Sequence, residues 1–142
     1  MTTYGDWASA VISQLASVLD HPDADIPDDR AEWLTSWAAH EDTRARFNPL
    51  ATTLRLHGST DFNSAGVQDY GTLGQGVHAV VGTLLGHDAA ERGYTTVVRD
   101  LLHPGSSYRD FRHAVSFSAW GPERGDYWIP VDPVDWTDKN LP

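Results

Sequence analysis

Residues 33–53, which read WLTSWAAHEDTRARFNPLATT, decide the fold. Trp33, Trp37 and Glu41 are four residues apart, so they fall on one stripe of a helix with 3.6 residues per turn. This apolar stripe ends on a carboxylate, and two interpretations of Glu41 follow. It is either a solvated residue of the last helical turn or an acid held at the edge of a cleft.

A helix is expected from Arg30 to Glu41 or a little beyond, because Pro49 stops regular structure soon afterwards. Asp29 with Glu32 three residues later predicts a capping box at its start. Negative charge is unfavourable at the C-terminal end of a helix, so helix propensity does not explain the position of Glu41.

Hydrophobic periodicity on both sides of this stretch predicts four more helices and a small β-hairpin. The expected helices span Tyr4 to Asp20, Thr72 to Leu85, about Ala89 to Leu102, and Ser107 to Val115. A strand and turn are expected in residues 52–62, and a partner strand in residues 65–71. Helices that flank a small β insertion predict an α+β, mostly helical fold.

The chain has 142 residues, a length typical of one domain. We expect residues 1–125 to form that domain and residues 126–142 to form a Pro-rich C-terminal tail. The tail is expected either to become ordered by docking or to stay partly loose. Its Trp128 and Trp136 fit two alternatives, docking on a partner subunit or packing on their own domain.

Composition excludes several classes of protein. The chain has no Cys, which rules out disulfides and thiolate zinc sites. Its 20 Asp and Glu against 10 Lys and Arg give a formal net charge of -10, which disfavours nucleic-acid binding. No apolar run approaches the roughly 20 residues of a membrane span. The N-terminus lacks the basic region of a signal peptide, so none is expected.

The motifs for metal and cofactor chemistry are also missing. The His residues show no His-x-x-x-His pair and no Glu-x-x-His on one face, so we expect no catalytic zinc site. The glycines in residues 71–80 lack the Lys-Ser/Thr of a phosphate-binding loop, and no nucleophile elbow occurs. We therefore expect chemistry that needs no cofactor.

Four short motifs follow one another along the chain. They are a Trp-x-x-x-Glu helix end, a Phe-Asn-Pro-Leu-x-Thr-Thr turn, a Phe-Asn-Ser-x-Gly-Val-x-x-Tyr hairpin and a Gly-hydrophobic-x-Ala helix start, at Trp37–Glu41, Phe47–Thr53, Phe62–Tyr70 and Gly76–Ala79. In this order they resemble the lysozyme-like domains of lysins and virion proteins of phages that infect actinobacteria.

The resemblance covers roughly residues 32–121. Residues 92–101, RGYTTVVRDL, are similar to the Tyr-containing helix of the family. Residues 116–121, SFSAWG, are similar to its Ser-Pro-Trp-Gly segment, with Ala119 in place of the Pro. The resemblance implies a lysozyme-like fold, in which helices surround the small hairpin.

The resemblance also implies an activity, cleavage of the β-1,4 bond of peptidoglycan glycan strands by a muramidase or a lytic transglycosylase. Such cleavage needs a proton donor at the leaving oxygen, and Glu41 has the position of this general acid. Burial beside Trp37 is expected to raise its pKa, so that it keeps a proton near neutrality. The alternative is a surface Glu41 that pairs with Arg44 or Arg46.

A second catalytic carboxylate is expected at Asp61 or Asp69, which flank the hairpin; either is also compatible with an ordinary turn or solvated residue. A lytic transglycosylase needs no second carboxylate, because the acetamido group of the sugar assists. The expected substrate-binding residues are Asn48, Asn63, Gln68, Tyr70, Tyr94 and Trp120. Each of these roles has a structural alternative for most of the residues. Asn48, Asn63, Gln68 and Tyr70 are also compatible with turn or hairpin structure, and Tyr94 with a position in the core.

A second hypothesis is a lysozyme-like module without turnover that serves as a virion or tail component. The negative charge favours this hypothesis, because it does not suit an enzyme that meets an anionic cell wall. Expected partners are glycan strands and, in the second case, other virion or tail subunits. We expect synthesis in the host cytoplasm, and action in the phage particle or the host cell envelope.

Overall fold

The computed structural model describes residues 1–121 and 129–142, and over these residues the protein is mostly helical with one small antiparallel sheet. The elements are α1 (Tyr4–Val18), the 3-10 helix η1 (Asp23–Asp25), α2 (Arg30–Glu41), β1 (Thr60–Asp61), β2 (Gln68–Asp69), α3 (Leu73–Leu84), α4 (Tyr94–Leu102) and α5 (Tyr108–Phe117). The predicted α+β, mostly helical class is confirmed.

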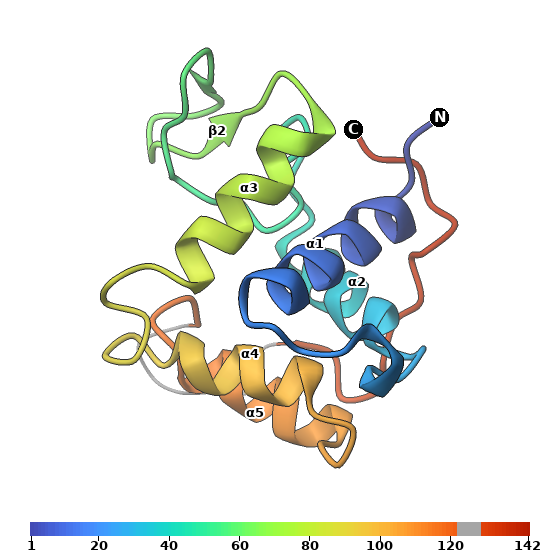
Figure 1. Ribbon diagram of the computed structural model, residues 1–142. Coiled ribbons are helices and arrows are strands. Elements are labelled where there is room, and N and C mark those ends of the chain that lie inside the picture. Colours follow the sequence, from blue (N-terminus) through green and yellow to red (C-terminus); the bar gives the residue numbers. More distant parts are fainter. Residues whose placement is uncertain (122–128) are drawn as a thin grey trace.

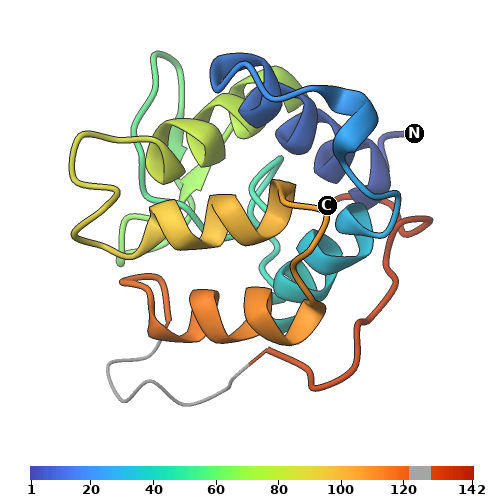
Figure 2. The same ribbon diagram turned by 60° about the horizontal axis from the view of Figure 1, so that its bottom comes forward.

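The helices form two pairs joined by α3. In Figure 1, α1 lies beside α2, α4 lies beside α5, and α3 leads from the hairpin towards the second pair. Figure 2 shows α4 and α5 running side by side along their whole length. The buried side chains of all five helices form one core, and its fully buried aromatic side chains from helices are Trp7 of α1, Trp37 of α2 and Phe111 of α5.

Side chains that cap the first turn fix where two helices begin. Thr3 with Asp6 starts α1, and Ser107 with Asp110 starts α5, each as a complete capping box. The capping box predicted at Asp29 is wrong, because its side chain caps no backbone N–H. The Asp29 carboxylate lies 2.6 Å from the buried guanidinium of Arg30 instead, where it balances a charge taken out of water.

Helix α4 begins at Tyr94, five residues later than the sequence predicted. Gly93 has a φ of 79°, a left-handed conformation that interrupts the helix, and a Cβ there would lie 3.2 Å from the Ser118 Cα. The Ala119 N–H donates to the Arg92 carbonyl at 2.7 Å. The segment after α5 therefore lies against the start of α4, and this contact sets the later helix start.

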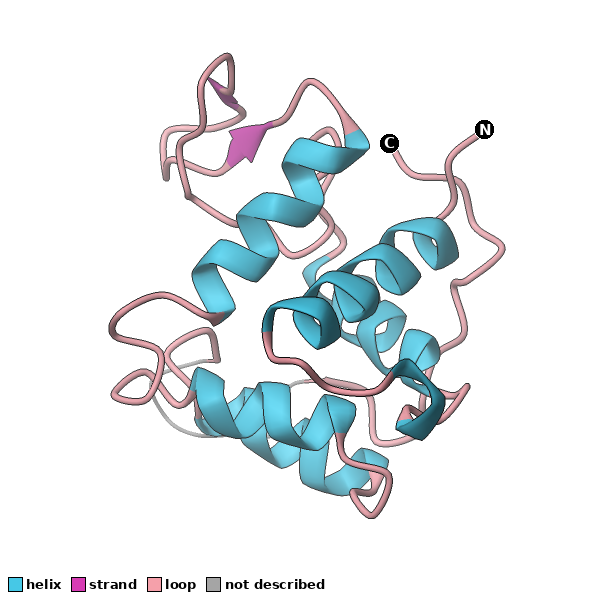
Figure 3. Ribbon diagram, in the orientation of Figure 1, coloured by secondary structure: helices cyan, strands magenta, loops and turns pink. Residues whose placement is uncertain are grey.

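The hairpin is shorter than the sequence predicted. Thr60 pairs with Asp69 and Asp61 with Gln68, and residues 52–57 form no strand, as the loop colouring of Figure 3 shows. In residues 52–57, the Asn48 and Tyr70 side chains bond the backbone of Thr52 and Leu54, and the Gln68 N–H donates to the Thr52 carbonyl. The predicted strand in residues 52–62 is therefore wrong except at its end.

The C-terminal residues 129–142 pack on their own domain and return to the start of the chain (Figure 1). The Tyr4 N–H donates to the Lys139 carbonyl at 2.8 Å, and the Trp136 ring lies edge-on to Tyr4 at 5.2 Å. Of the two alternatives for Trp136, the structure therefore shows packing on its own domain. Trp128 and the predicted boundary at residue 125 lie outside the described residues.

Candidate active site

Glu41 is the last residue of α2, and its side chain is half-buried. One turn earlier on the same stripe, Trp37 is fully buried. The Trp37 ring meets the Trp120 ring edge-on at 4.9 Å, and Trp120 meets Tyr94 at 5.6 Å. Trp37, Trp120 and Tyr94 thus form an aromatic row that extends from the stripe of Glu41 to the start of α4.

Burial raises the pKa of Glu41 to about 7 from an ordinary value of 4.5. The Trp37 indole N–H acts in the opposite direction, because it favours the ionised carboxylate. It makes no hydrogen bond within 3.5 Å to any described residue, so its effect on Glu41 is that of a nearby dipole. With this pKa, about half of the molecules carry the Glu41 proton at pH 7.

Among the described residues, no ion pair includes Glu41, and neither Arg44 nor Arg46 neutralises it. Both arginines are exposed, and Arg46 uses its backbone rather than its guanidinium in the contacts of this region. The alternative of a surface Glu paired with an arginine is therefore not what the structure shows. Without a cation beside it, desolvation is the largest influence on the Glu41 pKa.

The chain after Glu41 is held in an unusual backbone conformation. Asp42, Phe47 and Ala51 all have positive φ, at 43°, 50° and 57°. A bulky residue such as Phe47 rarely adopts this region, and each such residue costs on the order of 1–3 kcal/mol. Strain of this kind persists only where neighbouring contacts hold it, and it is concentrated at functional sites.

Asn48 supplies one of these contacts from inside the protein. Its amide nitrogen donates to the carbonyls of Thr52 and Gln68 at 2.9 and 2.8 Å, and its amide oxygen accepts from the Thr52 N–H at 2.8 Å. The side chain is fully buried. Asn48 therefore fixes the turn and, in this structure, has no surface to offer the substrate that the sequence analysis assigned to it.

Close packing of the backbone supplies the second contact. A Cβ at Gly76 of α3 would lie 1.9 Å from the Phe47 carbonyl oxygen, so only glycine fits there. The glycine of the fourth motif therefore holds the turn of the second motif in place, at the side opposite to Asn48.

Gln68 and Tyr70 are buried as well. The Gln68 amide donates to the Asp61 carboxylate at 2.7 Å, and the Tyr70 hydroxyl donates to the Leu54 carbonyl at 2.6 Å. Like Asn48, they order the loop around the site, and the expected contact with substrate is closed to them in this structure. Asn63 is exposed, but its amide oxygen accepts the Ala65 and Val67 N–H groups, which is hairpin chemistry.

The two hairpin carboxylates differ in their surroundings. Asp69 accepts the Arg46 N–H at 2.7 Å and thereby ties the turn after α2 to the hairpin. Asp61 is exposed, lies 3.1 Å from the Arg55 guanidinium, and is oriented by the buried Gln68 amide. Asp61 is therefore accessible to a ligand, whereas Asp69 is engaged in holding the backbone.

A groove of about 560 Å³ lies between residues 53–55, the end of α3 and residues 86–94. Tyr94 lines it, so the aromatic row connects the helix of Glu41 with this groove. Thr53 and Arg55 line its opposite side. Sequence reasoning missed Arg55, and the only signal available was its position two residues after the Thr-Thr pair of the second motif.

No three His, Cys, Asp or Glu side chains of residues 1–121 and 129–142 lie together as metal ligands would. No helix among these residues has the length and apolar character to cross a membrane. Comparison with known proteins gives no match, whether to a family model, a curated protein or a solved structure. The functional argument therefore rests on the site itself.

Proposed function

We propose that the protein cleaves the β-1,4 bonds of peptidoglycan glycan strands, that its domain is lysozyme-like, and that Glu41 is the general acid. The observation that carries this proposal is the half-buried Glu41 carboxyl, whose pKa burial raises to about 7 with no cation beside it. A carboxylic acid of this kind donates a proton near neutrality, which glycoside cleavage requires.

The reaction begins when the protonated Glu41 gives its proton to the bridging oxygen as the bond from that oxygen to the sugar C1 breaks. The leaving sugar departs as an alcohol, and positive charge develops at C1. The Glu41 carboxylate that remains is stabilised by the adjacent Trp37 N–H dipole, which has no other partner among the described residues. The indole thus acts mainly after proton transfer, when the charge has formed.

The surroundings of the hairpin carboxylates favour a route with one carboxylate, that of a lytic transglycosylase. Asp69 is engaged by the Arg46 N–H, and Asp61, although exposed, has one oxygen in contact with both Gln68 and Arg55. In this route the sugar's acetamido oxygen stabilises C1, its C6 oxygen then attacks C1, and Glu41 takes back the hydroxyl proton. The product is an anhydro sugar, and no water is consumed.

Hydrolysis is the second candidate, and the orientation of Asp61 favours it. The Gln68 amide fixes one Asp61 oxygen at 2.7 Å, and an exposed ion pair such as that with Arg55 is worth only about 0–1 kcal/mol, so it opens readily. Asp61 is then able to act as the base for an attacking water. Asp61→Asn abolishes cleavage in this candidate and preserves it in the one-carboxylate route.

The test is clearing of purified actinobacterial cell walls by the wild type and by Glu41→Gln. Asp42→Asn is the matched control, because it removes one charge from the adjacent exposed residue and Asn tolerates its left-handed backbone. We expect clearing by wild type and Asp42→Asn only, with products that carry anhydro ends. Reducing ends would indicate hydrolysis. A folded wild type that clears no wall would sink the proposal and leave the non-catalytic virion or tail module.

A further inference from the structure

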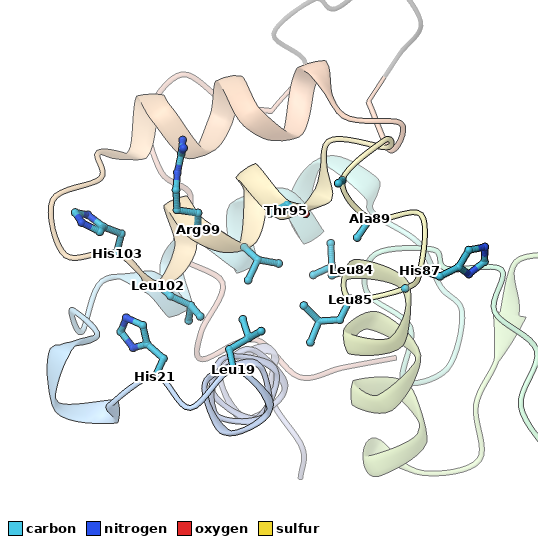
Figure 4. A pocket seen from close by; sticks show the side chains of 13 residues that line it. Leu19, His21, Leu84, Leu85, His87, Ala89, Thr95, Arg99, Leu102 and His103 are labelled. Carbon is cyan, nitrogen blue, oxygen red and sulfur yellow. The ribbon is translucent and has the colours of Figure 1, made fainter.

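A second cavity lies away from Glu41, between the C-terminal ends of α1 and α3 and one side of α4. Its volume is about 540 Å³, within the range of roughly 300–1,000 Å³ typical of small-molecule sites. Figure 4 shows the side chains that line it. None of them has a role in the proposed cleavage chemistry.

The floor of this cavity is part of the hydrophobic core. Leu84, Val98 and Leu102 line it and are almost completely buried in the core cluster, while Leu19 at the rim is 48% exposed. In Figure 4, Leu102, Leu19 and Leu84 form a band across the cavity. An apolar band of this kind favours a ligand with a hydrocarbon chain, because each methylene removed from water adds to the affinity.

Polar groups stand at the two ends of the band. His21 and His103 lie at one end and His87 at the other (Figure 4). The His103 Nδ1 accepts the Gly105 N–H at 2.9 Å, so its hydrogen is on Nε2, which remains a donor for a ligand. The His21 Nδ1 is 3.1 Å from the Pro22 carbonyl and therefore donates to it.

The charge of the lining is opposite to that of the protein. No Asp or Glu is among the described residues that line the cavity, although the chain carries 20 of them. Arg99 also lines it; in Figure 4 its side chain points towards α5. Its contacts with Asp100 are 3.2 and 3.3 Å long; the Asp100 carboxylate is buried and also accepts the Ser106 hydroxyl, whereas the Arg99 side chain is 66% exposed. The exposed Arg99 guanidinium therefore adds positive charge at the His103 end, partly balanced by Asp100.

We propose that this cavity binds a medium-chain alkyl carboxylate, with the chain over Leu84, Val98 and Leu102 and the carboxylate beside the His103 Nε2–H and the Arg99 guanidinium. An anion is favoured over a cation, because the lining supplies donors and positive charge and no carboxylate. The site is independent of Glu41, so Glu41→Gln is expected to bind the same ligand equally well.

The probe is decanoate, titrated by calorimetry into the wild-type protein below its micelle concentration, with octanoate and decyltrimethylammonium for comparison. We expect saturable binding of decanoate at one site. Octanoate lacks two methylenes and should bind about tenfold more weakly. Decyltrimethylammonium has the same chain with the opposite charge and should bind at least about tenfold more weakly, because no carboxylate faces it.

Thr95→Trp and Thr96→Trp form the matched pair of variants. Both residues are exposed on α4, but only Thr95 lines this cavity. Thr95→Trp should weaken decanoate at least about tenfold, and Thr96→Trp should stay within about twofold of the wild type. Absence of saturable decanoate binding, equal binding of the cation, or equal effects of the two tryptophans would each overturn the proposal. If one variant does not fold, the comparison of the three ligands on the wild-type protein still tests the proposal.

Discussion

Replacing Glu41 with Gln should stabilise the protein above neutral pH and leave its stability unchanged in acid. Gln has the shape of the protonated Glu but cannot ionise. Below pH 4.5 Glu41 carries its proton in both the folded and the unfolded state, so the substitution changes little. Above this pH the unfolded chain releases the proton, while burial makes the folded state keep it until about pH 7. Folding of the wild type therefore weakens progressively between these two values.

The magnitude follows from the same two pKa values. The difference between 4.5 and about 7, multiplied by about 1.36 kcal/mol per pH unit, gives about 3.4 kcal/mol as an upper bound. Glu41 retains some contact with water, which screens its charge, so we expect about 2–3 kcal/mol. For a domain of this size that gain corresponds to a rise in Tm of about 4–12 °C.

The assay is urea unfolding and thermal melting of wild type, Glu41→Gln and Asp42→Asn at pH 4 and pH 8. Asp42→Asn controls for loss of one negative charge from a chain with a net charge of -10. The gain at pH 8 should be larger for Glu41→Gln than for Asp42→Asn and should disappear at pH 4. Equal gains in the two variants, or a destabilised Glu41→Gln at pH 8, would refute the buried, unpaired carboxylate.

Three further predictions concern the parts that hold the site. Gly76→Ala should cost at least about 2 kcal/mol in urea unfolding, because its Cβ meets the Phe47 carbonyl, whereas Gly74→Ala on the same helix has room and should be neutral or stabilising. A similar loss from both would contradict this. Asn48→Ala should lower the free energy of unfolding by about 2–4 kcal/mol, because it leaves buried hydrogen-bond partners unbonded. Asn63→Ala at the exposed turn should lower it by about 1 kcal/mol or less. Deleting residues 129–142 should lower the free energy of unfolding by at least about 2 kcal/mol, because it removes the packing of Ile129 and Trp136 and uncovers core residues such as Tyr4; unchanged melting would show that this segment contributes nothing.

The helices could be predicted where the apolar pattern was long and its ends were marked. Helix α2 spans Arg30–Glu41 as expected, because the Trp33–Trp37–Glu41 stripe has a clear period. The start of α4 could not be predicted, because it depends on Gly93 meeting Ser118, a contact between residues far apart in the sequence. The capping box at Asp29 failed for a similar reason, since the carboxylate pairs with a buried Arg30 that itself bonds the His103 carbonyl.

The raised pKa of Glu41 could be predicted from the sequence, and the roles of the residues around it less well. The position of Glu41 on an apolar stripe led directly to its raised pKa. Sequence motifs pointed to Asn48, Gln68 and Tyr70, but the motifs do not distinguish a side chain that touches a ligand from one that holds a loop. Burial makes that distinction, because all three are enclosed and hydrogen-bonded within the protein. Tyr94 and Trp120, which were also expected to bind substrate, lie in the aromatic row, and Tyr94 is almost completely buried in the core, as its alternative had it.

The most direct test of the account is a carboxyl-carbon NMR titration of Glu41 in the folded protein, with Glu41→Gln used to assign the resonance. The account predicts a midpoint near pH 7, where burial places the pKa of this group. A midpoint close to 4.5, the ordinary value for a Glu in water, would show that the side chain is solvated and would contradict its role as the proton donor.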